Sequence, residues 1–554
     1  MILPPFHRRW WVVASAVASM AALIVAIRLD PQARADALAP AAGDLRDRVV
    51  AGGELLRMLL PLCAVGLIGV AVGLARTTAP VPRETGVRSD RFAAALLLIL
   101  LAGLVARLPR LGEGLWYDEI TAWRDYGAHG PRVIIGTYHD PANHVLHTLC
   151  TWFSVDRLAF LGLTDEVALR LPALVFSLVA IAAAAMLGKR VAGAATGLVA
   201  GALVAIAPVA ILEGTDARGY SAMMAVGVGA TALLLEATRR GGGWWLSYAL
   251  VCAAGCWVHP VTACVPLGHG LWLVARLLRG DRAGAAPGLV SLALAALVTL
   301  VAYAPIVPQI LALRSTLSVT SADQPTLVGI EGIKMLEQLG GVWWWPAALP
   351  GLMLLMLGFV LCVRDPLKRS LVTAGFAGTG VFILLVVMLD SWCYARFLLF
   401  CVPVALTIAA VGLVHLWRTQ RLAAAFVAAL VVTGSATDLV RRPPRQPLRD
   451  AVDHLHATGD ASRSGVAIGL LHQALDVYAA DLDLTWSLHH GRDLPERIEA
   501  IDPAWAIMLY PRSVEPVVYE ALAAQGLEQT ARLPGWIDWN GNGDVLVFRR
   551  RTGE

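Results

Sequence analysis

Apolar runs of bilayer-spanning length dominate this 554-residue chain and restrict the folds that it can adopt. A hydrocarbon core of about 30 Å takes roughly 20 helical residues to cross. The runs recur from near the N-terminus to about residue 440, so we expect an α-helical polytopic membrane protein with about thirteen transmembrane helices. The expected spans are 10–28, 55–75, 92–107, 167–188, 191–212, 219–238, 244–259, 260–278, 286–306, 346–363, 371–389, 396–416 and 421–438.

Composition supports a membrane protein and gives no indication of nucleic-acid binding. Hydrophobic residues make up 57% of the chain and charged residues 16%, whereas soluble domains carry about 25% charged residues. The formal net charge of +4 is small for this length, so no nucleic-acid partner is expected. The eight cysteines show no zinc-site spacing, and we predict no metal site.

The membrane part divides into two expected regions. Residues 1–91 would contain two N-terminal transmembrane helices and a cytoplasmic linker. Residues 92–440 would form the membrane core, with large external loops at 108–166 and 307–345. Both loops are too long to be plain connectors, which suggests that they carry function.

A soluble tail is expected over 441–554, after the hinge Arg441-Arg442-Pro443-Pro444-Arg445. Short apolar stretches alternate there with helical patterns, and this predicts a small α/β domain. The expected strands are 466–470, 483–486, 504–509 and 544–548, and the expected helices are 448–457, 472–480 and 513–525.

Basic junctions between the spans predict how the chain is threaded, because short cytoplasmic loops are enriched in Lys and Arg. Basic residues fall at alternate junctions here. Placing those junctions in the cytoplasm puts most of the unusual polar groups, and the tail, on the extracytoplasmic side. The groups gathered there are Asp118 and Glu119, Glu213 to Arg218, His259, the 307–345 loop and Asp390 to Arg396.

Two adjacent carboxylates, Asp118 and Glu119, follow the third expected span and lie among Trp116, Tyr117 and Trp123. Paired acids among aromatic rings suit a partly dry cleft, in which a carboxylate can act as a base and a sugar ring can stack. The same residues also fit an aromatic belt at the membrane surface with two solvated acids. This stretch alone does not decide between the two interpretations.

The first external loop carries a second polar cluster, His139-Asp140-Pro141-Ala142-Asn143-His144. An amphipathic helix is expected after it at 145–161, because apolar residues recur there at helical spacing. This pattern is typical of a helix lying in the membrane interface. Surface burial without a function also explains it.

Three later junctions carry polar residues near the membrane face. Asp216-Ala217-Arg218-Gly219-Tyr220 would either cap a helix with an exposed ion pair or present Arg218 inward. His259 precedes a proline, which is typical of a helix kink, although a ligand role stays open. Arg396, after Tyr394, would either reach the lipid headgroups or hold a buried anion.

Taken in order, these motifs resemble those of the GT-C superfamily of polytopic glycosyltransferases, which use polyprenyl-phosphate-linked sugars. They are most similar to the group of protein O-mannosyltransferases and lipid A aminoarabinose transferases. The likeness covers roughly 92–440, and glutamate is commoner in the family at the position of Asp216. It rests on Leu115–Ile120, His139–His144, Thr164–Ala173, Asp216–Tyr220 and Tyr394–Leu398.

The resemblance implies an inverting transferase that moves a sugar from a polyprenyl-phosphate-linked donor to an acceptor in the cell envelope. Asp118 would be the catalytic base, and Glu119 would position it or the acceptor. Arg218 and Arg396, with His259, would bind the lipid phosphate. The residues expected to contact the acceptor or the sugar are Trp116, Tyr117, His139, Asp140, Asn143, Asp216, Tyr220 and Tyr394.

The expected partners are the donor lipid, membrane lipids and an envelope acceptor, which would be a protein, a lipid or a glycan. No cofactor is expected, and two acids with a distant histidine give little support to a divalent cation. The alanine- and arginine-rich composition favours a bacterial plasma membrane, with the active side and the tail in the periplasm. The sequence specifies neither the sugar nor the oligomeric state.

Two other functions remain open at this point. A carrier or flippase for a lipid-linked sugar would show polar residues near the bilayer midplane and paired repeats, whereas the polar groups here gather at one mouth. A scaffold whose tail is the working part is the other alternative. Replacing the arginines with neutral residues and measuring lipid-phosphate binding would separate an enzyme from a scaffold.

Overall fold

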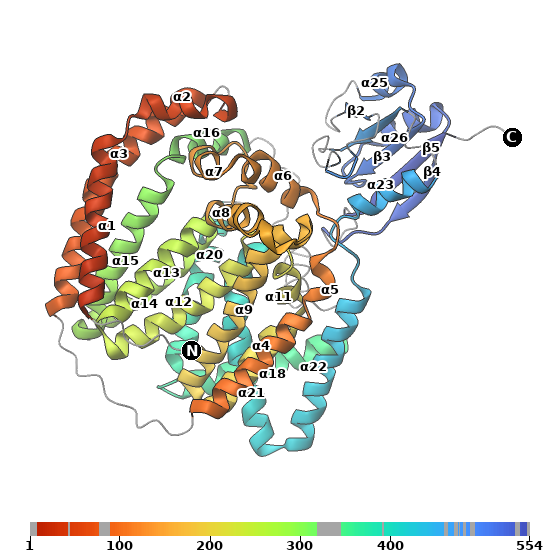
Figure 1. The fold of residues 1–554 in the computed structure, drawn as a ribbon. Helices are drawn as coiled ribbons and strands as arrows, with labels where there is room; N and C mark the ends of the chain where they lie inside the picture. The colour runs from red at the N-terminus through yellow and green to blue at the C-terminus, as the bar shows by residue number, and fades with distance from the viewer. Residues whose placement is uncertain are drawn as a thin grey trace.

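The structure is a computed structural model that describes residues 8–42, 45–76, 89–317, 345–389, 393–458, 464–469, 475, 477–479, 484–487, 494–537 and 543–550. A bundle of long apolar helices forms the main body, and a smaller unit built on a β-sheet follows it in the chain (Figure 1).

Apolar composition and length suit the bundle helices to a bilayer, where all backbone groups must bond within the helix. The bundle helices are α1 (Arg8–Arg28), α3 (Arg46–Arg76), α4 (Ser89–Val105), α9 (Asp165–Ala192), α10 (Ala194–Ile206), α11 (Pro208–Glu213), α12 (Tyr220–Arg240), α13 (Gly243–Val258), α14 (Cys264–Leu278), α15 (Arg282–Tyr303), α18 (Trp345–Arg364), α19 (Arg369–Gly375), α20 (Ala377–Met388), α21 (Val402–Thr419) and α22 (Arg421–Arg441). Within the described residues, nine helical stretches are long and apolar enough to cross a membrane.

Each expected span overlaps a helix of this bundle, so the predicted fold class is confirmed. The run expected at 191–212 is divided, because Ala207 is extended (φ −61°, ψ 122°) and Pro208 begins α11. The run at 371–389 is likewise divided into α19 and α20, and a 3₁₀ turn, η7 (Ala395–Cys401), precedes α21.

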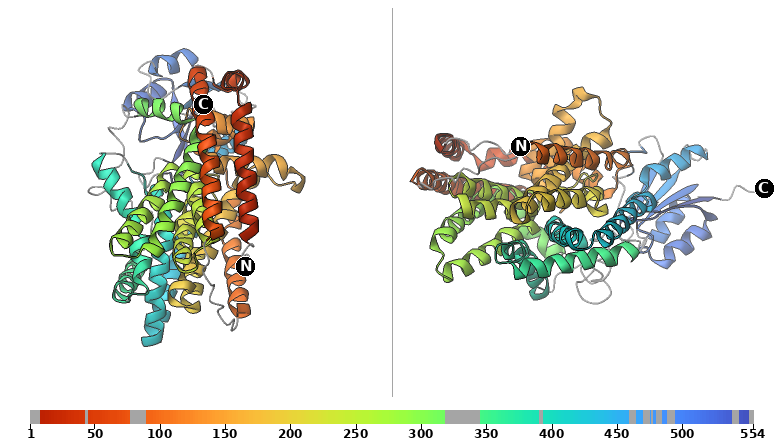
Figure 2. Two further views of the ribbon diagram at one scale, coloured as in Figure 1. Left: turned by 90° about the vertical axis from the view of Figure 1, so that its left-hand side faces the viewer. Right: turned by 90° about the horizontal axis from the view of Figure 1, so that it is seen from below.

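The N-terminal helices form a hairpin at one edge of the bundle, which two further views also show (Figure 2). α1 packs along α3, and α3 packs on α15. α2 (Pro31–Ala42) turns away from α1 by 82°. Gly52 of α3 allows close approach, because a Cβ there would lie 2.2 Å from the carbonyl oxygen of Pro305.

Short helices of the 108–166 loop cover one end of the bundle, the upper end in Figure 1. They are α5 (Leu108–Leu111), α6 (Tyr117–Asp125), η2 (Gly127–His129), α7 (Pro131–Gly136), α8 (Val145–Trp152), η3 (Phe153–Arg157) and η4 (Ala159–Leu161). The amphipathic helix expected at 145–161 is therefore shorter than predicted. α8 ends at Trp152, and a π-helical turn and a 3₁₀ turn continue the chain.

α16 (Val307–Leu317) packs over this loop through one buried glutamine. Gln309 Nε2 donates to the carbonyl oxygen of Gly136 at 3.0 Å, and its Oε1 accepts from the N–H of Tyr138 at 2.7 Å. Most of the predicted 307–345 loop, including Trp343 and Trp344, lies outside the described residues.

A five-stranded sheet forms the C-terminal unit, with the strand order β2-β1-β3-β5-β4. β1 runs parallel to β2 and β3, and β5 runs antiparallel to β3 and β4. α23 packs on one face of the sheet, and α25 and α26 pack on the other. The elements are α23 (Leu448–Ala457), β1 (Gly465–Ile468), β2 (Leu484–Ser487), α25 (Leu494–Ile501), β3 (Trp505–Leu509), α26 (Pro516–Ala524), β4 (Leu527–Leu533) and β5 (Val545–Arg550).

Most tail elements match their expected positions, and the predicted α/β class is confirmed. β4 was not predicted, because it is an edge strand whose residues are largely exposed and polar. α25 was also missed, and the helix expected at 472–480 falls mostly outside the described residues.

Candidate active site

The first turn of α6 carries both predicted catalytic acids. Trp116 is extended (φ −104°, ψ 172°), and Glu119 Oε2 accepts its backbone N–H at 3.2 Å, which is one half of a capping box. Two acids in a first helical turn also suit the positive end of the helix dipole. Because successive residues of a helix project about 100° apart, Asp118 and Glu119 face different surroundings.

Glu119 faces the protein interior, and its side chain has no exposed surface. Oε1 accepts from Arg170 Nε at 2.8 Å and from the N–H of Ala217 at 2.6 Å, and Oε2 accepts from Arg170 Nη2 at 2.6 Å. Burial alone would raise the pKa of Glu119, but Arg170 and the backbone donors lower it below its usual value. Glu119 is therefore ionised, with both oxygens bonded within the protein, and its role in positioning Asp118 or the acceptor stays a prediction.

Arg170, on α9, uses its remaining donors on the chain that leads into α6. Nη1 donates to the carbonyl oxygens of Leu111 at 3.1 Å and Glu113 at 2.6 Å, and Nη2 donates to that of Gly114 at 3.0 Å. One guanidinium thus fixes both the acid pair and the backbone before it.

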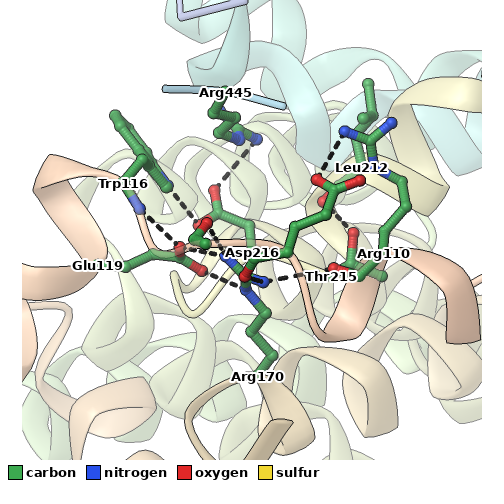
Figure 3. A pocket seen from close by; sticks show the side chains of 10 residues that line it. Arg110, Trp116, Glu119, Arg170, Leu212, Thr215, Asp216 and Arg445 are labelled. Carbon is green, nitrogen blue, oxygen red and sulfur yellow. Dashed lines mark hydrogen bonds and ion pairs between the residues drawn. The ribbon is translucent and has the colours of Figure 1, made fainter. Parts of the chain in front are cut away.

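Asp216 lies on the interior side as well, between Trp116 and Arg445 (Figure 3). Its Oδ1 accepts from Trp116 Nε1 at 2.9 Å. Arg445, from the hinge of the tail, lies 3.1 Å from Asp216 Oδ2 and 2.8 Å from Glu213 Oε1. Burial raises the pKa of Asp216 to about 7, and the Arg445 charge opposes that rise.

A small polar pocket opens within this network, lined among others by Arg110, Glu113, Thr215 and Arg445. Arg110 Nη2 pairs with Glu113 Oε2 at 2.9 Å and also donates to the carbonyl oxygen of Pro443 at 3.3 Å. The charged groups around the pocket already pair with one another, so it is not a substrate cleft.

Asp118 faces the other side, and its side chain is 20% exposed. Its Oδ2 lies 3.6 Å from Arg218 Nη2, and its carbonyl oxygen accepts from Arg218 Nη1 at 3.2 Å. Nη1 also donates to the carbonyl oxygen of Ala142 at 2.8 Å. Of the two arrangements that the sequence left open, the structure shows the one in which Arg218 points inward, since the residue is only 4% exposed.

A second guanidinium, Arg396 of η7, lies close to the first. The guanidinium carbons of Arg218 and Arg396 lie 5.9 and 5.8 Å from the ring centroid of Tyr220, and that of Arg396 lies 4.4 Å from the centroid of Tyr394. These distances fit cation–π contact. Three helix junctions that are distant in the sequence therefore bring two cations to one aromatic group beside Asp118.

Two histidines, the buried His144 and the partly buried His259, complete this side. The ring of His144 lies 4.7 Å from that of His259 and 5.2 Å from that of Tyr220. His144 Nδ1 accepts the backbone N–H of Gly219 at 2.8 Å, so the neutral ring carries its proton on Nε2, which lies 3.3 Å from Arg218 Nη2. A neutral imidazole and a guanidinium thus lie in direct contact beside Asp118.

Burial keeps these imidazoles neutral. It lowers the pKa of His144 well below the ordinary value and that of His259 to about 3, and the Arg218 charge adds to both shifts. The histidines supply N–H groups and aromatic surface here, while the positive charge comes from the arginines.

The remaining predicted contact residues surround the Asp118 side at different depths. Tyr117 meets Tyr510 of the tail edge-on at 6.4 Å, and His139 stacks on Tyr126 at 4.6 Å, with Nε2 3.6 Å from Asp125 Oδ2. Asp140 accepts the N–H of Ala142 at 2.6 Å, and burial raises its pKa.

Three other predicted contact residues are displaced from the open side. Trp116 and Asp216 are 2% exposed and bond to each other. Asn143 is 3% exposed and donates to the carbonyl oxygen of Ile134 at 3.0 Å. In this structure the three side chains bond within the protein, and their contact with the acceptor or the sugar stays a prediction.

Arg107, just after α4, supports the break between α10 and α11. It donates to Ser177 Oγ at 2.7 Å and to the carbonyl oxygens of Ala205 and Ala210, each at 3.1 Å. A helix that ends inside a bundle leaves carbonyl groups without partners. Arg107 satisfies them and so fixes the position from which α11 leads to Glu213 and Arg218.

Four residues of this site were not found from the sequence: Arg107, Arg170, His144 and Arg445. Arg445 was interpreted as part of a hinge and Arg170 as part of a motif with no role. The signal available for Arg170 and Arg107 was an arginine within an apolar span, which is costly and therefore informative.

Comparison with known proteins adds fold-level information. No protein-family model matches the chain, and no curated protein matches its sequence. The crystal structure of ArnT from Cupriavidus metallidurans bound to undecaprenyl phosphate superposes on 83% of this chain and 97% of its own, with 14% identity and a TM-score of 0.54. The chain has the GT-C fold.

Two further structures are similar to this chain. ArnT in the apo state covers the same shares of both chains, with 14% identity and a TM-score of 0.51. The oligosaccharyltransferase AglB from Archaeoglobus fulgidus, in complex with an inhibitory peptide and a dolichol-phosphate, covers 79% of this chain and 71% of its own, with 11% identity and a TM-score of 0.48. In this fold, Asp118, Arg218 and Arg396 lie at the covered end of the bundle.

Proposed function

We propose that this protein is an inverting glycosyltransferase that moves a sugar from a polyprenyl-phosphate-linked donor to an acceptor in the cell envelope. The observation that carries the proposal is the partly exposed Asp118 carboxylate, which lies 3.6 Å from Arg218, together with a second guanidinium, that of Arg396, which lies near the same Tyr220 ring as Arg218. The ArnT structure of the same fold, which is bound to undecaprenyl phosphate, supports this donor class.

A phosphate-linked sugar needs little acid catalysis, because the phosphate is already a good leaving group. One base suffices to take the proton of the acceptor nucleophile, in contrast to the two carboxylates of a glycoside hydrolase. Asp118 is proposed as that base. Of the two adjacent acids it alone has exposed surface, because Glu119 is buried by Arg170.

The departing lipid phosphate gains negative charge, and preorganised cations in a dry site stabilise it. Arg218 and Arg396 are proposed as those cations, and His259 as a neighbour that shapes the pocket. His144 joins them here, because its Nε2 carries a proton and lies 3.3 Å from Arg218 Nη2. A phosphate bound by Arg218 would therefore have the His144 N–H group close by.

The proposed reaction forms a bond between the acceptor nucleophile and the anomeric carbon while the bond to the phosphate oxygen breaks. Asp118 takes the nucleophile's proton, and the lipid phosphate leaves with the electron pair. Attack from the face opposite the phosphate inverts the anomeric centre. Tyr117, His139, Asp140, Tyr220 and Tyr394 are proposed to line the path of the acceptor and the sugar. No metal or cofactor takes part in the proposed step.

We place the reaction on the extracytoplasmic face of a bacterial plasma membrane, together with the tail. Arg190, Arg239 and Arg240 gather around Glu236 at the opposite end of the bundle, and basic ends face the cytoplasm in membrane proteins. The proposed acceptor is a protein, lipid or glycan of the envelope.

The test combines the native substrate pool with one substitution. Mass spectrometry of envelope glycans and polyprenyl-phosphate sugars in a deletion strain identifies the product that disappears and the donor that accumulates. Purified protein is then assayed with that donor. Asp118→Asn should lower turnover by about 10²–10⁴-fold, the range that a general base contributes.

Asp156→Asn is the matched control, because Asp156 is a half-exposed acid of the same loop that pairs with the exposed Arg157. It should leave turnover unchanged. Wild-type turnover in Asp118→Asn would remove Asp118 as the base. A deletion strain that changes only the sidedness of a lipid-linked sugar, with no lost product, would identify a flippase instead.

A further inference from the structure

The hinge of the C-terminal unit enters the membrane core instead of passing over it. Arg442 pairs with Asp438 of α22 at 2.7 Å, and its guanidinium lies 4.0 Å from the ring centroid of Trp536. Arg445, with a side chain 11% exposed, lies 5.1 Å from the ring centroid of Trp116. The tail therefore contributes a charged side chain to the layer directly behind α6.

The charge balance of that layer depends on Arg445. Four buried or half-buried carboxylates meet three guanidinium groups there, and Arg445 is the guanidinium that comes from the tail. It faces Glu213 and Asp216, while Arg170 serves Glu119 and Arg110 serves Glu113. Without Arg445, Glu213 and Asp216 would share a buried space and lose the cation that pairs with both, and like charges there repel strongly.

A short path of contacts links Arg445 to Asp118. Asp216, which Arg445 neutralises, accepts from Trp116 at the start of α6. The next residue, Ala217, donates its N–H to Glu119, and the one after it is Arg218, which pairs with Asp118. One three-residue turn thus has the tail's arginine on its inner side and the proposed base on its outer side.

We propose that Arg445 is a positioning residue: by neutralising Glu213 and Asp216 it holds the Asp216–Arg218 turn in place, so that Arg218 stays beside Asp118 and the C-terminal unit becomes an obligatory part of the active site. The catalytic half of this inference rests on the proposed function. The structural half, which is the placement of α6 and the turn, does not depend on it.

The variant that tests the inference is Arg445→Met, which keeps much of the side-chain length and removes the charge. The matched control is Arg449→Met. Arg449 also joins the tail to the core, but it does so through Glu166 Oε1 at 3.0 Å and the carbonyl oxygen of Gly112 at 3.0 Å, away from the acids that Arg445 neutralises. Equal damage in both variants would mean that docking alone matters, and this would overturn the inference.

The expected kinetic result in the full chain is a drop in kcat of tenfold or more for Arg445→Met. The KM for the lipid donor should rise as well, because the displaced turn carries Arg218, which is one of the proposed phosphate ligands. Arg449→Met should stay within twofold of wild type in both constants. An unchanged kcat in Arg445→Met overturns the inference.

A double variant keeps the test valid if Arg445→Met folds poorly. Asp216→Asn/Arg445→Met removes one of the two acids together with the arginine. It should recover at least part of the lost kcat and yield, because the repulsion between the two acids disappears and the introduced amide oxygen can still accept from Trp116. A double variant no better than Arg445→Met contradicts the charge-balance role.

Hydrogen–deuterium exchange gives a readout that needs no substrate. Arg445→Met should raise exchange in peptides covering 115–125 and 214–220, and Arg449→Met should not. If the exchange changes as expected while the wild type transfers no sugar, the proposed function fails and the positioning role stands. If the wild type transfers sugar and neither exchange nor kcat changes in Arg445→Met, the positioning role alone fails.

Discussion

The first turn of α6 presents one carboxylate to Arg218 on a partly open side and the next to Arg170 in the interior. The Asp118 side chain is 20% exposed and lies 3.6 Å from its guanidinium partner. The Glu119 side chain has no exposed surface and lies 2.6 Å from its own. Adjacent residues of the same chemical class therefore occupy different environments only because the helix turns by about 100° between them.

The two environments decide which carboxylate keeps oxygen lone pairs for a further partner. Glu119 has donors on both oxygens, so little lone-pair capacity is left for a proton or a substrate. Asp118 faces an arginine at a distance that leaves room for another partner. The satisfied acid holds the helix, and the less satisfied acid is free to react.

Glu119→Gln gives the largest expected effect on stability. The substitution leaves Arg170 charged and buried without its carboxylate, and breaking one partner of a buried ion pair costs about 3–5 kcal/mol. Thermal unfolding in detergent and the yield of folded protein measure the loss. Asp118→Asn, on the open side, should change stability by less than about 0.5 kcal/mol.

If Glu119→Gln and Asp118→Asn destabilise the protein equally, Asp118 is also structural, and the two acids do not have different roles. Glu119→Asp is a useful intermediate. It keeps the charge but shortens the reach to Arg170, so it should fall between the wild type and Glu119→Gln.

Arg218→Met tests the partly exposed side of α6, where Asp118 lies. The variant removes a donor to the proposed lipid phosphate, and a hydrogen bond to a charged group contributes about 1.5–3 kcal/mol. Binding of undecaprenyl phosphate should therefore weaken by about 10- to 150-fold, as measured by titration of the purified protein. Arg170→Met changes the interior side, where Glu119 lies. This variant should lower the yield of folded protein without a selective loss of lipid affinity.

Asp118→Asn should bind the same lipid as tightly as wild type or more tightly, because it removes a negative charge beside the phosphate position. Weaker binding in Asp118→Asn than in Arg218→Met would contradict the division of roles.

The smallest expected effect is a pH dependence of stability, and it comes from His147 of α8. The charges that act on His147 are those of Arg218, on the Asp118 side, and Glu119, in the interior. Burial, together with the Arg218 charge and against the opposing charge of Glu119, lowers the pKa of His147 to about 3. The unfolded chain takes up a proton below about pH 6.5 while the folded protein does not. Its contribution to stability is thus complete at neutral pH and declines as the pH falls from 6.5 toward 3, by up to about 2 kcal/mol at pH 5.

His147→Asn should flatten this dependence. Thermal unfolding at pH 7 and pH 5 measures it, and the gap between the two temperatures should be smaller in the variant than in the wild type. An unchanged gap would show that other histidines, such as His144 and His259, account for the acid sensitivity.

Sequence reasoning was sufficient for the features that local pattern determines. Span length predicted the long helices of the bundle, because each apolar run must satisfy its own backbone in a bilayer. The polar turn that carries Arg218 was found from the sequence as well, although its pattern left the direction of Arg218 open. These features depend on residues that are close together in the chain.

The features that sequence reasoning missed depend on contacts between distant residues. Glu119 and Arg170 are 51 positions apart in the sequence. Arg445, which follows the last helix of the bundle in the sequence, pairs with Glu213. No periodicity links such residues. The division between Asp118 and Glu119 was missed for the same reason, since it is decided by what packs on each side of α6.

Arg107 has a consequence for turnover. Its four hydrogen bonds within the described residues all go to neutral oxygens, of one serine and three carbonyl groups. Arg107 is a buried cation whose hydrogen bonds hold the backbone at the break between α10 and α11. Breaking these bonds would leave its charge without partners, at a large cost in free energy. Arg107 therefore holds the segment that leads to Arg218 in one position. Under the proposed function, the lipid phosphate would meet an Arg218 guanidinium that is already in place and needs no reorganisation in each reaction cycle.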